Sequence, residues 1–261
     1  MTLLRIVWLY VRIGILGELE YRANFVVQLL QSTVGVGFWL ANLWIIFSHT
    51  STLAGWSATE LVALLGVFFL VGGLIRMVVQ PSMQRLMEDV RLGTLDFTLT
   101  KPADAQMLVS VKQVEVWKLI DVVFGLGMIL AGLLRLEQSV GVAQALAFAF
   151  ALLCGGAMVY SFWLMLATCT FWFVRLENIL VIFQAMWEAG RWPIGIYPPW
   201  LRYTLTFLVP VAFATTVPAE ALAGRLDAGT LAGAFALAAA MLGASRWFWS
   251  VGVRHYSGAS A

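Results

Sequence analysis

Long apolar runs separated by short polar segments dominate the chain and predict membrane-spanning helices. The runs cover residues 25–47, 61–79, 114–134, a stretch within 142–174, a run that starts near 179, and 229–251. About 20 apolar residues, at about 1.5 Å of rise each, carry a helix across the hydrocarbon core of a bilayer. We therefore predict an all-α polytopic membrane protein with six transmembrane helices, built as a single transmembrane domain over residues 1–261.

Local signals bound the second predicted span. Ser57 followed by Glu60 at the third helical position forms a capping box, which starts a helix. Gln80 and Pro81 are expected to end it, because proline lacks a backbone donor and clashes with the preceding turn.

The first residues differ from the spans. Residues 3–16 are apolar but carry Arg5 and Arg12, seven positions apart and so on one helical face. They lack the unbroken apolar core and the small-residue cleavage site of a signal peptide. We interpret residues 1–24 as an amphipathic interfacial helix at the membrane surface. A cytoplasmic extension of the first span is the alternative.

Composition agrees with a membrane protein. Hydrophobic residues make up 61% of the chain, charged residues only 11%, and mean hydropathy is +0.88, whereas soluble domains carry about 25% charged residues. The formal net charge of +2 is too small to indicate a nucleic-acid partner. Cys154 and Cys169 share one apolar run, where helical geometry sets them roughly 22 Å apart, too far for a disulfide. Because His49 and His255 lie far apart in sequence, no metal site is expected.

The basic residues divide unevenly between the two sides of a six-span chain. One side carries twelve: Arg5, Arg12, Arg22, Arg76, Arg85, Arg91, Lys101, Lys112, Lys118, Arg175, Arg246 and Arg254. The other side carries four: Arg135, Arg191, Arg202 and Arg225. Because lysine and arginine collect in cytoplasmic loops, this asymmetry places both termini in the cytoplasm.

Residues 80–112, which connect the second and third spans, hold the most informative polar pattern. Their apolar positions recur at i, i+3, i+4 and i+7 and predict a short amphipathic helix: Met83, Leu86, Met87 and Val90. Arg85 and Asp89 form an i,i+4 pair on it. Gly93 stands where a glycine ends a helix, and Asp104 is placed to cap the third span. A cytoplasmic docking element and a solvated loop explain this pattern equally well.

The run 88–102 resembles the signature of ABC type-2 permeases. At its centre Gly93-Thr94-Leu95-Asp96 is similar to the family's Gly-Thr-Leu-acidic motif, although many members have Glu where Asp96 stands. The six-span layout, the N-terminal surface helix and the proline-rich outer segment also resemble the family. The similarity is greatest to a branch of small bacterial permeases whose substrates are mostly uncharacterised.

The resemblance implies a function and a set of partners. In the family this connection forms a coupling helix that docks on an ATPase subunit, which assigns that role here to Arg85, Glu88, Asp89, Arg91, Gly93, Thr94, Leu95 and Asp96. Two ABC ATPase subunits would bind ATP and Mg, and a second permease subunit, identical or paralogous, would complete the path through the bacterial cytoplasmic (inner) membrane. The chain has no phosphate-binding GxxxxGK(S/T) loop, so we expect it to hold no cofactor and to be no enzyme itself.

Five of the seven prolines fall in residues 192–222, between the fifth and sixth predicted spans. The candidate residues of this segment are Pro193, Tyr197, Pro198, Pro199, Pro210 and Pro218. The apolar stretch 203–217 is too short to cross a membrane and is broken by Pro210. We interpret the segment as re-entrant helices that cap the outer end of a pathway, similar to the extracellular hairpin of type-2 exporters. An interfacial loop anchored by Tyr197, Trp200 and Tyr203 is the alternative.

A few ionisable residues within or near the spans are candidate polar sites. Glu188 and Arg191, three positions apart, either neutralise each other or contact a substrate. Glu115, Lys118 and Asp121 are successive i,i+3 neighbours, which favours a structural ion-pair ladder over a substrate or proton site.

These patterns together predict a permease subunit that exports an amphipathic or lipid-like substrate with energy from separate ATPase subunits. A stand-alone ion- or proton-coupled secondary transporter is the alternative, and it calls for midplane charges and broken helices in repeated halves. A membrane-embedded enzyme of lipid metabolism is disfavoured, because the chain lacks clustered polar catalytic residues.

Overall fold

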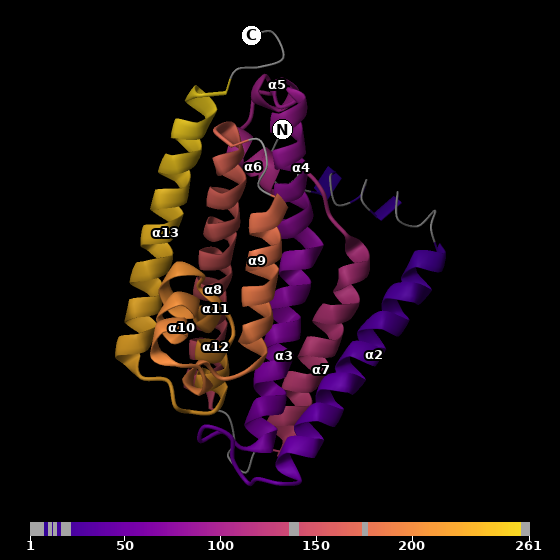
Figure 1. Cartoon of the computed structure of the whole chain (residues 1–261), viewed down its shortest axis with the longest axis vertical. Coiled ribbons are helices and arrows are strands. Elements are labelled where there is room, and N and C mark those ends of the chain that lie inside the picture. The colour runs from indigo at the N-terminus through magenta and orange to yellow at the C-terminus, as the bar shows by residue number, and fades with distance from the viewer. Residues whose placement is uncertain are drawn as a thin grey trace.

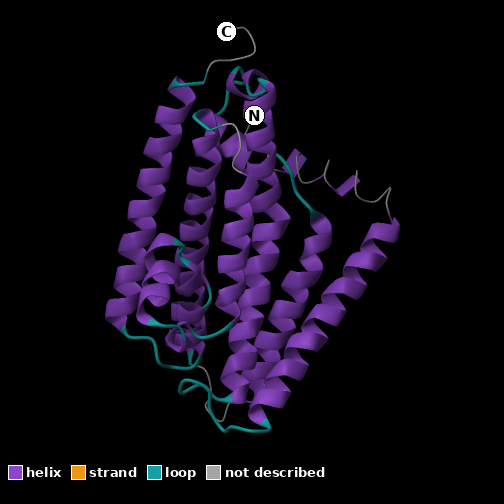
Figure 2. Ribbon diagram, in the orientation of Figure 1, coloured by secondary structure: helices purple, strands orange, loops and turns teal. Residues whose placement is uncertain are grey.

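The computed structural model describes residues 22–135, 141–173 and 177–256, together with positions 8, 9, 12, 15 and 16. Within these ranges the chain is helical and contains no strand, only one isolated bridge between Leu53 and Trp56. Figure 2 shows helices along nearly the whole described chain, with loops gathered at the two ends of the molecule and around residues 192–222. The predicted surface helix, residues 1–24, lies almost wholly outside the described residues.

The helical elements are, in chain order, α2 (Arg22–Phe47), α3 (Ala58–Leu74), the π-helical turn η1 (Ile75–Val79), α4 (Gln80–Leu92), α5 (Asp96–Leu99), α6 (Ala105–Ser110), η2 (Val116–Lys118), α7 (Leu119–Arg135), α8 (Val142–Thr168), η3 (Cys169–Phe171), α9 (Glu177–Glu188), η4 (Ala189–Arg191), η5 (Ile194–Ile196), α10 (Pro199–Tyr203), the π-helical turn η6 (Thr204–Leu208), α11 (Val211–Ala214), α12 (Thr216–Leu222) and α13 (Ala228–Arg254).

Five helices of the described chain are long and apolar enough to cross a membrane: Phe25–Phe47, Ala58–Leu92, Val116–Arg135, Val142–Phe171 and Ala228–Arg254. A bent pair, Pro199–Leu208 and Val211–Leu222, meets the same test only when its two arms, which lie at 67°, are taken together. α9 has 12 residues and is shorter than a span. The prediction of a multi-pass, all-helical membrane protein is confirmed.

The long helices run side by side in alternating directions (Figure 1). α3 with α4, α8 and α13 run toward the end that carries α5, the upper end in Figure 1, whereas α2, α7 and α9 run away from it. α10, α11 and α12 lie at the opposite end, beside the lower halves of α8 and α13. The molecule therefore has two distinct ends, one formed by α4–α6 and one reached by the bent pair.

α3 is the central helix, and 13 of its 17 residues are buried. It crosses α7 so closely that a Cβ built on Gly125 would lie 2.4 Å from the Leu70 nitrogen and 2.7 Å from the Gly66 oxygen. α8 meets α11 in the same way, because a Cβ on Gly155 would lie 2.4 Å from the Phe213 carbonyl oxygen. Small residues permit such backbone contact between helices in a membrane.

The sequence predicted that the second span ends at Gln80 and Pro81, and this prediction is wrong. α3, η1 and α4 continue as one helical run of 35 residues from Ala58 to Leu92. Pro81 has no N–H to donate to the carbonyl four residues earlier, and that carbonyl, on Met77, instead accepts the Glu115 N–H at 2.8 Å. The Ser82 hydroxyl also donates to the Gln113 carbonyl at 2.8 Å and accepts the Gln113 N–H at 3.2 Å. The π turn and the segment before η2 thus satisfy the backbone around the proline.

Candidate functional site

The end of α4 is closed by the predicted glycine. Gly93 has a left-handed backbone, with φ of 69°, and its N–H donates to the Val90 carbonyl at 3.3 Å. The Thr94 N–H reaches back to the Asp89 carbonyl at 2.9 Å, which completes the two bonds typical of a glycine-terminated helix. Only glycine adopts this conformation without strain, so the glycine fixes where the chain leaves α4.

Asp89 is the centre of the connection between the second and third spans. Its side chain is only 1% exposed, yet its carboxylate accepts from Arg85 Nε at 3.2 Å and from the Thr94 hydroxyl at 2.9 Å, and it pairs with Lys112 Nζ. Lys112 also donates to the Thr98 hydroxyl at 3.4 Å. Burying a carboxylate requires this degree of pairing, so a single charge holds α4, the turn after it and the chain before η2 together.

The predicted docking residues differ in burial. Leu95 is fully buried, as is Asp89, whereas Arg91 is exposed. Two apolar side chains that the sequence analysis did not single out are also exposed at this tip, Leu92 by 55% and Phe97 by 74%. Arg85, Glu88, Gly93, Thr94 and Asp96 are half-buried. The tip thus exposes one aromatic and one aliphatic side chain.

Polar contacts join this tip to two long helices. Arg246 of α13 donates to both carboxylate oxygens of Asp104, at 2.9 and 2.5 Å, and to the Gln106 side-chain oxygen at 2.9 Å. Tyr160 of α8 contacts Gln106 at 3.2 Å and the Ser110 hydroxyl at 2.7 Å. The hydrogen bond from Arg246 holds the pKa of Asp104 below its ordinary value. Asp104 was predicted to cap the third span. It caps α6 instead, where its carboxylate accepts the Met107 N–H at 3.1 Å.

A cavity of about 160 Å³ lies behind the tip, between α4, η3 and the end of α13. Met87, Phe171 and Tyr256 contribute to its wall. Burial, with a smaller effect of the Asp96 charge, raises the pKa of the Tyr256 phenol. Tyr256, just after α13, therefore lies near the Gly-Thr-Leu-Asp turn.

Asp121 pairs across helices and not along its own. It accepts from Arg76 Nη2 at 3.1 Å and from the Ser32 hydroxyl of α2 at 2.6 Å. Lys118 donates to the Gln28 side-chain oxygen at 3.0 Å. The ladder predicted through Glu115, Lys118 and Asp121 is wrong in its partners, because Asp121 pairs with Arg76 and Ser32 and Lys118 donates to Gln28.

The predicted pair of Glu188 and Arg191 forms an ion pair. The Arg191 guanidinium also lies 4.1 Å from the centroid of the Trp39 ring and 5.0 Å from that of Phe68. Guanidinium groups are attracted to aromatic faces, so this arginine links η4 to α2 and α3. Mutual neutralisation, one of the two interpretations of this pair, is what the geometry shows.

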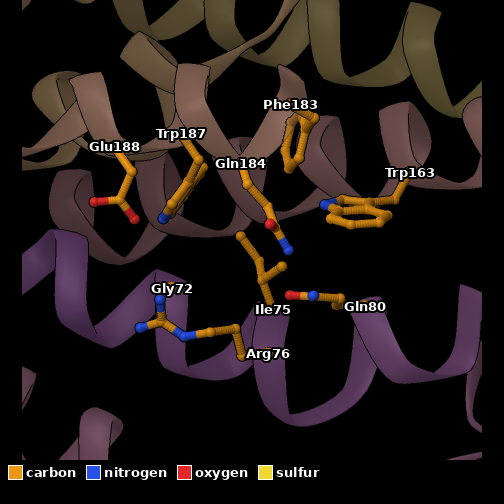
Figure 3. Close-up of a pocket in the computed structure, with 9 residues that line it drawn as sticks. All are labelled: Gly72, Ile75, Arg76, Gln80, Trp163, Phe183, Gln184, Trp187 and Glu188. Atoms are coloured by element: carbon orange, nitrogen blue, oxygen red, sulfur yellow. The ribbon is translucent and has the colours of Figure 1, made fainter. Parts of the chain in front are cut away.

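A second cavity, of about 260 Å³, lies where η1 faces α9 and α8 (Figure 3). Four of its lining residues are polar or charged: Arg76, Gln80, Gln184 and Glu188. The rest of the wall is mostly aromatic, with Trp163, Phe183 and Trp187 (Figure 3). Asp121 does not line this cavity but reaches it through its pair with Arg76. No local sequence signal indicated it, because its lining residues fall in two groups, 72–80 and 163–188, that lie more than 80 residues apart in the chain.

The proline-rich segment folds into two unlike arms. Pro198 and Pro199 start α10, whereas Pro210 starts α11 and Pro218 lies buried in α12. Every residue from 211 to 219 is buried, against α8 and α3 among others, while Trp200, Tyr203 and Phe207 of the first arm are 69%, 66% and 58% exposed.

Tyr197 and Pro193 hold the start of this segment. The Tyr197 hydroxyl donates to the Ala189 carbonyl at 2.9 Å, and Pro193 is buried. Tyr197 therefore binds the protein itself, whereas the interfacial-loop alternative has it as an anchor at the membrane surface. Arg202 adds a hydrogen bond to the Gly195 carbonyl at 2.8 Å.

Arg225, just after α12, connects the bent pair to the start of α3 by hydrogen bonds. Its Nη2 donates to both Glu60 carboxylate oxygens at 2.7 and 2.9 Å, and its Nη1 to the Gly55 carbonyl at 2.8 Å. Glu60 is also the predicted capping-box partner of Ser57, and that box is confirmed. The link to Arg225, 165 residues away, carried no sequence signal.

No group of three or more His, Cys, Asp or Glu residues that could hold a metal occurs in the part of the chain that the structure describes. Both cysteines are free. A family model described as "ABC-2 family transporter protein" matches residues 36–260. No curated protein and no solved structure gives a match.

Proposed function

The chain belongs to the ABC-2 transporter family, and from this premise we propose that it is the permease subunit of an ATP-driven exporter. The proposal is supported most directly by the connection between the second and third spans. That connection is a compact element held by one buried carboxylate, and it places Leu92 and Phe97 in an exposed position at one end of the helical bundle. In the proposed assembly of two permeases and two ABC ATPase subunits, the ATPases would dock at this connection. They would bind ATP and Mg, and this chain would bind no nucleotide and no metal.

In this proposal the membrane contains six spans, with α9 and η4 as the fifth. α9 runs back along the bundle from the α5 end (Figure 1), and the bent pair then returns part of the way as a re-entrant cap. The end with α4–α6 is the cytoplasmic side of a bacterial inner membrane, and both termini lie there. Residues 1–24 would lie on the same surface as an amphipathic helix.

The contacts around the docking element suggest how ATPase movement would reach the membrane. Force applied at Phe97 reaches α4 through the Asp89 pairs, and α13 and α8 through Arg246 and Tyr160. α4 is continuous with α3, which carries Glu60 and hence the link to the bent pair. A push on the docking element would therefore reach the outer cap along this helical run and through the pair of Glu60 with Arg225.

A second permease subunit, identical or paralogous, would complete the path. α2 exposes large apolar side chains along its length, among them Val34, Phe38 and Trp44, which face lipid or that second subunit. The substrate we propose is amphipathic or lipid-like, since aromatic walls and polar groups meet within the bundle at the larger cavity.

The test is whether the tagged full chain co-purifies with an ABC ATPase from its native membrane and whether that assembly depends on Phe97. Central aromatic contacts contribute about 2 kcal/mol to an interface, so Phe97→Ser should weaken assembly roughly thirtyfold. Phe173→Ser is the matched control, because Phe173 is 62% exposed and lies between η3 and α9, outside the docking element. Equal assembly of both variants, or transport by the purified chain with no ATPase present, would refute the proposal.

A further inference from the structure

The larger cavity lies within the helical bundle and is lined by both aromatic and polar side chains. Trp163 comes from α8, Phe183 and Trp187 from α9, and Ile75 and Arg76 from η1 (Figure 3). Its volume of about 260 Å³ exceeds several times the roughly 30 Å³ that one water occupies in the liquid. A body with one or two rings or a short alkyl chain fits such a space.

Trp163 carries an indole N–H donor at the wall of this cavity. Its side chain is 1% exposed, and its indole Nε1 is buried with no hydrogen-bond partner among the described residues. Figure 3 shows the nitrogen on the edge of the ring that faces Gln184. Arg76 Nε is also buried, with no hydrogen-bond partner in the described part of the chain. An unpaired donor is costly inside a membrane protein, and a phenylalanine would provide similar packing without that cost.

The charges around the cavity cancel in pairs. Arg76 is bound to Asp121, and Glu188 is bound to Arg191. A charged ligand would therefore be buried without a counter-ion, which is unfavourable in a low-dielectric site. What the cavity offers is hydrogen bonding, from Trp163 and from the Gln80 and Gln184 carboxamides that line it.

We propose that this cavity binds an uncharged amphipathic molecule with an aromatic or alkyl body and an acceptor oxygen, such as that of a ketone, ester or ether. The oxygen accepts the Trp163 N–H, and the body packs on Trp187 and Phe183. The assignment of this molecule as the transported substrate rests on the proposed permease function. The binding itself does not.

The test uses the naphthalene ketone Prodan, an uncharged dye whose emission responds to hydrogen bonding at its carbonyl oxygen. The full chain without any ATPase is placed in lipid nanodiscs, and empty nanodiscs give the background. We expect saturable binding to the wild type, and three- to tenfold weaker binding to Trp163→Phe, the usual effect of one hydrogen bond. The matched control is Trp249→Phe, because Trp249 is 4% exposed but does not line the cavity; its affinity should stay within about twofold of the wild type.

A second variant keeps the proposal testable if Trp163→Phe does not fold. A Cβ on Gly72 would lie 3.2 Å from Trp187 Nε1 and 3.3 Å from Arg76 Nη2, so Gly72→Val crowds the cavity against movable side chains and should abolish Prodan binding. The same dye ring with a sulfonate in place of the ketone should not bind. Saturable binding of the sulfonate equal to that of Prodan, or equal Prodan affinity in the wild type and Trp163→Phe, overturns the proposal. So does the absence of saturable binding.

Two further arms separate the sources of the ligand and the two proposals. Competition of Prodan by a short-chain diacylglycerol supports a lipid ester as the natural occupant, and lack of competition supports a free small molecule. Either result supports a cavity that binds a ligand through the ligand's acceptor oxygen. ATPase assembly that depends on Phe97, without Prodan binding, removes this inference alone. Prodan binding without ATPase assembly removes the proposed function alone.

Discussion

The buried carboxylate of Asp89 should control the stability of the docking element far more than its surface charges do. Asp89→Asn keeps the size of the side chain and removes the charge that Lys112 and Arg85 share. Lys112 is 21% exposed, so it is left largely buried beside a neutral amide. Breaking one side of such a pair costs about 3 kcal/mol.

The reverse change should cost less. Lys112→Met leaves Asp89 with Arg85 Nε at 3.2 Å and the Thr94 hydroxyl at 2.9 Å, so the carboxylate keeps two of its three partners. Losing one hydrogen bond to a charged group costs about 2 kcal/mol. Because the two residues touch, the double variant should cost less than the two single costs added together.

Hydrogen–deuterium exchange of the full chain in nanodiscs measures this locally. A loss of about 3 kcal/mol raises the opening equilibrium roughly hundredfold, which should appear as faster exchange at Thr94 and across residues 93–112. Asp227→Asn is the control, because Asp227 caps α13 on the exposed surface. Unchanged exchange in Asp89→Asn, or a larger effect of Lys112→Met, would contradict the assignment of Asp89 as the centre of the element.

Three other predictions concern contacts elsewhere in the fold. Gly125→Ala should destabilise the chain by about 1–3 kcal/mol in thermal unfolding, because the added methyl meets backbone, while Gly127→Ala, with no atom within 4 Å of the new Cβ, should be neutral. Arg225→Ala should cost about 1 kcal/mol, less at high salt, because the arginine is 40% exposed. The lowered pKa of Asp104 means that the Arg246 contact stabilises the fold above the ordinary value of 3.8 and is lost as pH falls through the lower folded-state value. The difference in melting temperature between wild type and Asp104→Asn should therefore shrink on acidification below 3.8, and a constant difference would contradict the mechanism.

Local signals in the sequence predicted local structure well. Ser57 with Glu60 and Gly93 each act through backbone groups only a few residues away, so their pattern was sufficient. The sequence-based prediction at Pro81 was wrong because its consequence depends on a distant partner. The carbonyl that the proline releases binds Glu115, and nothing in the residues around 81 indicates that segment.

The candidate sites follow the same division. The Gly-Thr-Leu-Asp motif that indicated the family was recognisable because its residues are consecutive, and the pairing of Glu188 with Arg191 because they are one turn apart. Lys112 was not recognised as the partner of Asp89, since 23 residues separate them. Nothing in the sequence indicated the larger cavity. Trp163 in an apolar helix is indistinguishable by pattern from any other buried aromatic residue, and only the fold shows that its N–H has no partner among the residues that the structure describes.

One helical run passes through three of these features. Ala58–Leu92 carries Glu60 at the end near the bent pair, Arg76 at the larger cavity and Asp89 at the end near the Gly-Thr-Leu-Asp turn. Arg76 and Asp89 are 13 residues apart, about 20 Å along a helix. The rest of the π turn and Pro81 lie between them, where the Met77 carbonyl and the Ser82 hydroxyl bond to the segment 113–115. A rotation of α4 that breaks the Met77 and Ser82 bonds to that segment would move Arg76 relative to α9, so ligand in the cavity and ATPase at the tip should influence each other through this one turn. Replacing Ser82 by Ala should weaken that influence while leaving each binding event intact, because Ser82 does not line the cavity and is fully buried. Measuring Prodan affinity with and without the bound ATPase in Ser82→Ala and wild type tests this, and equal coupling in both would show that the turn is only a scaffold.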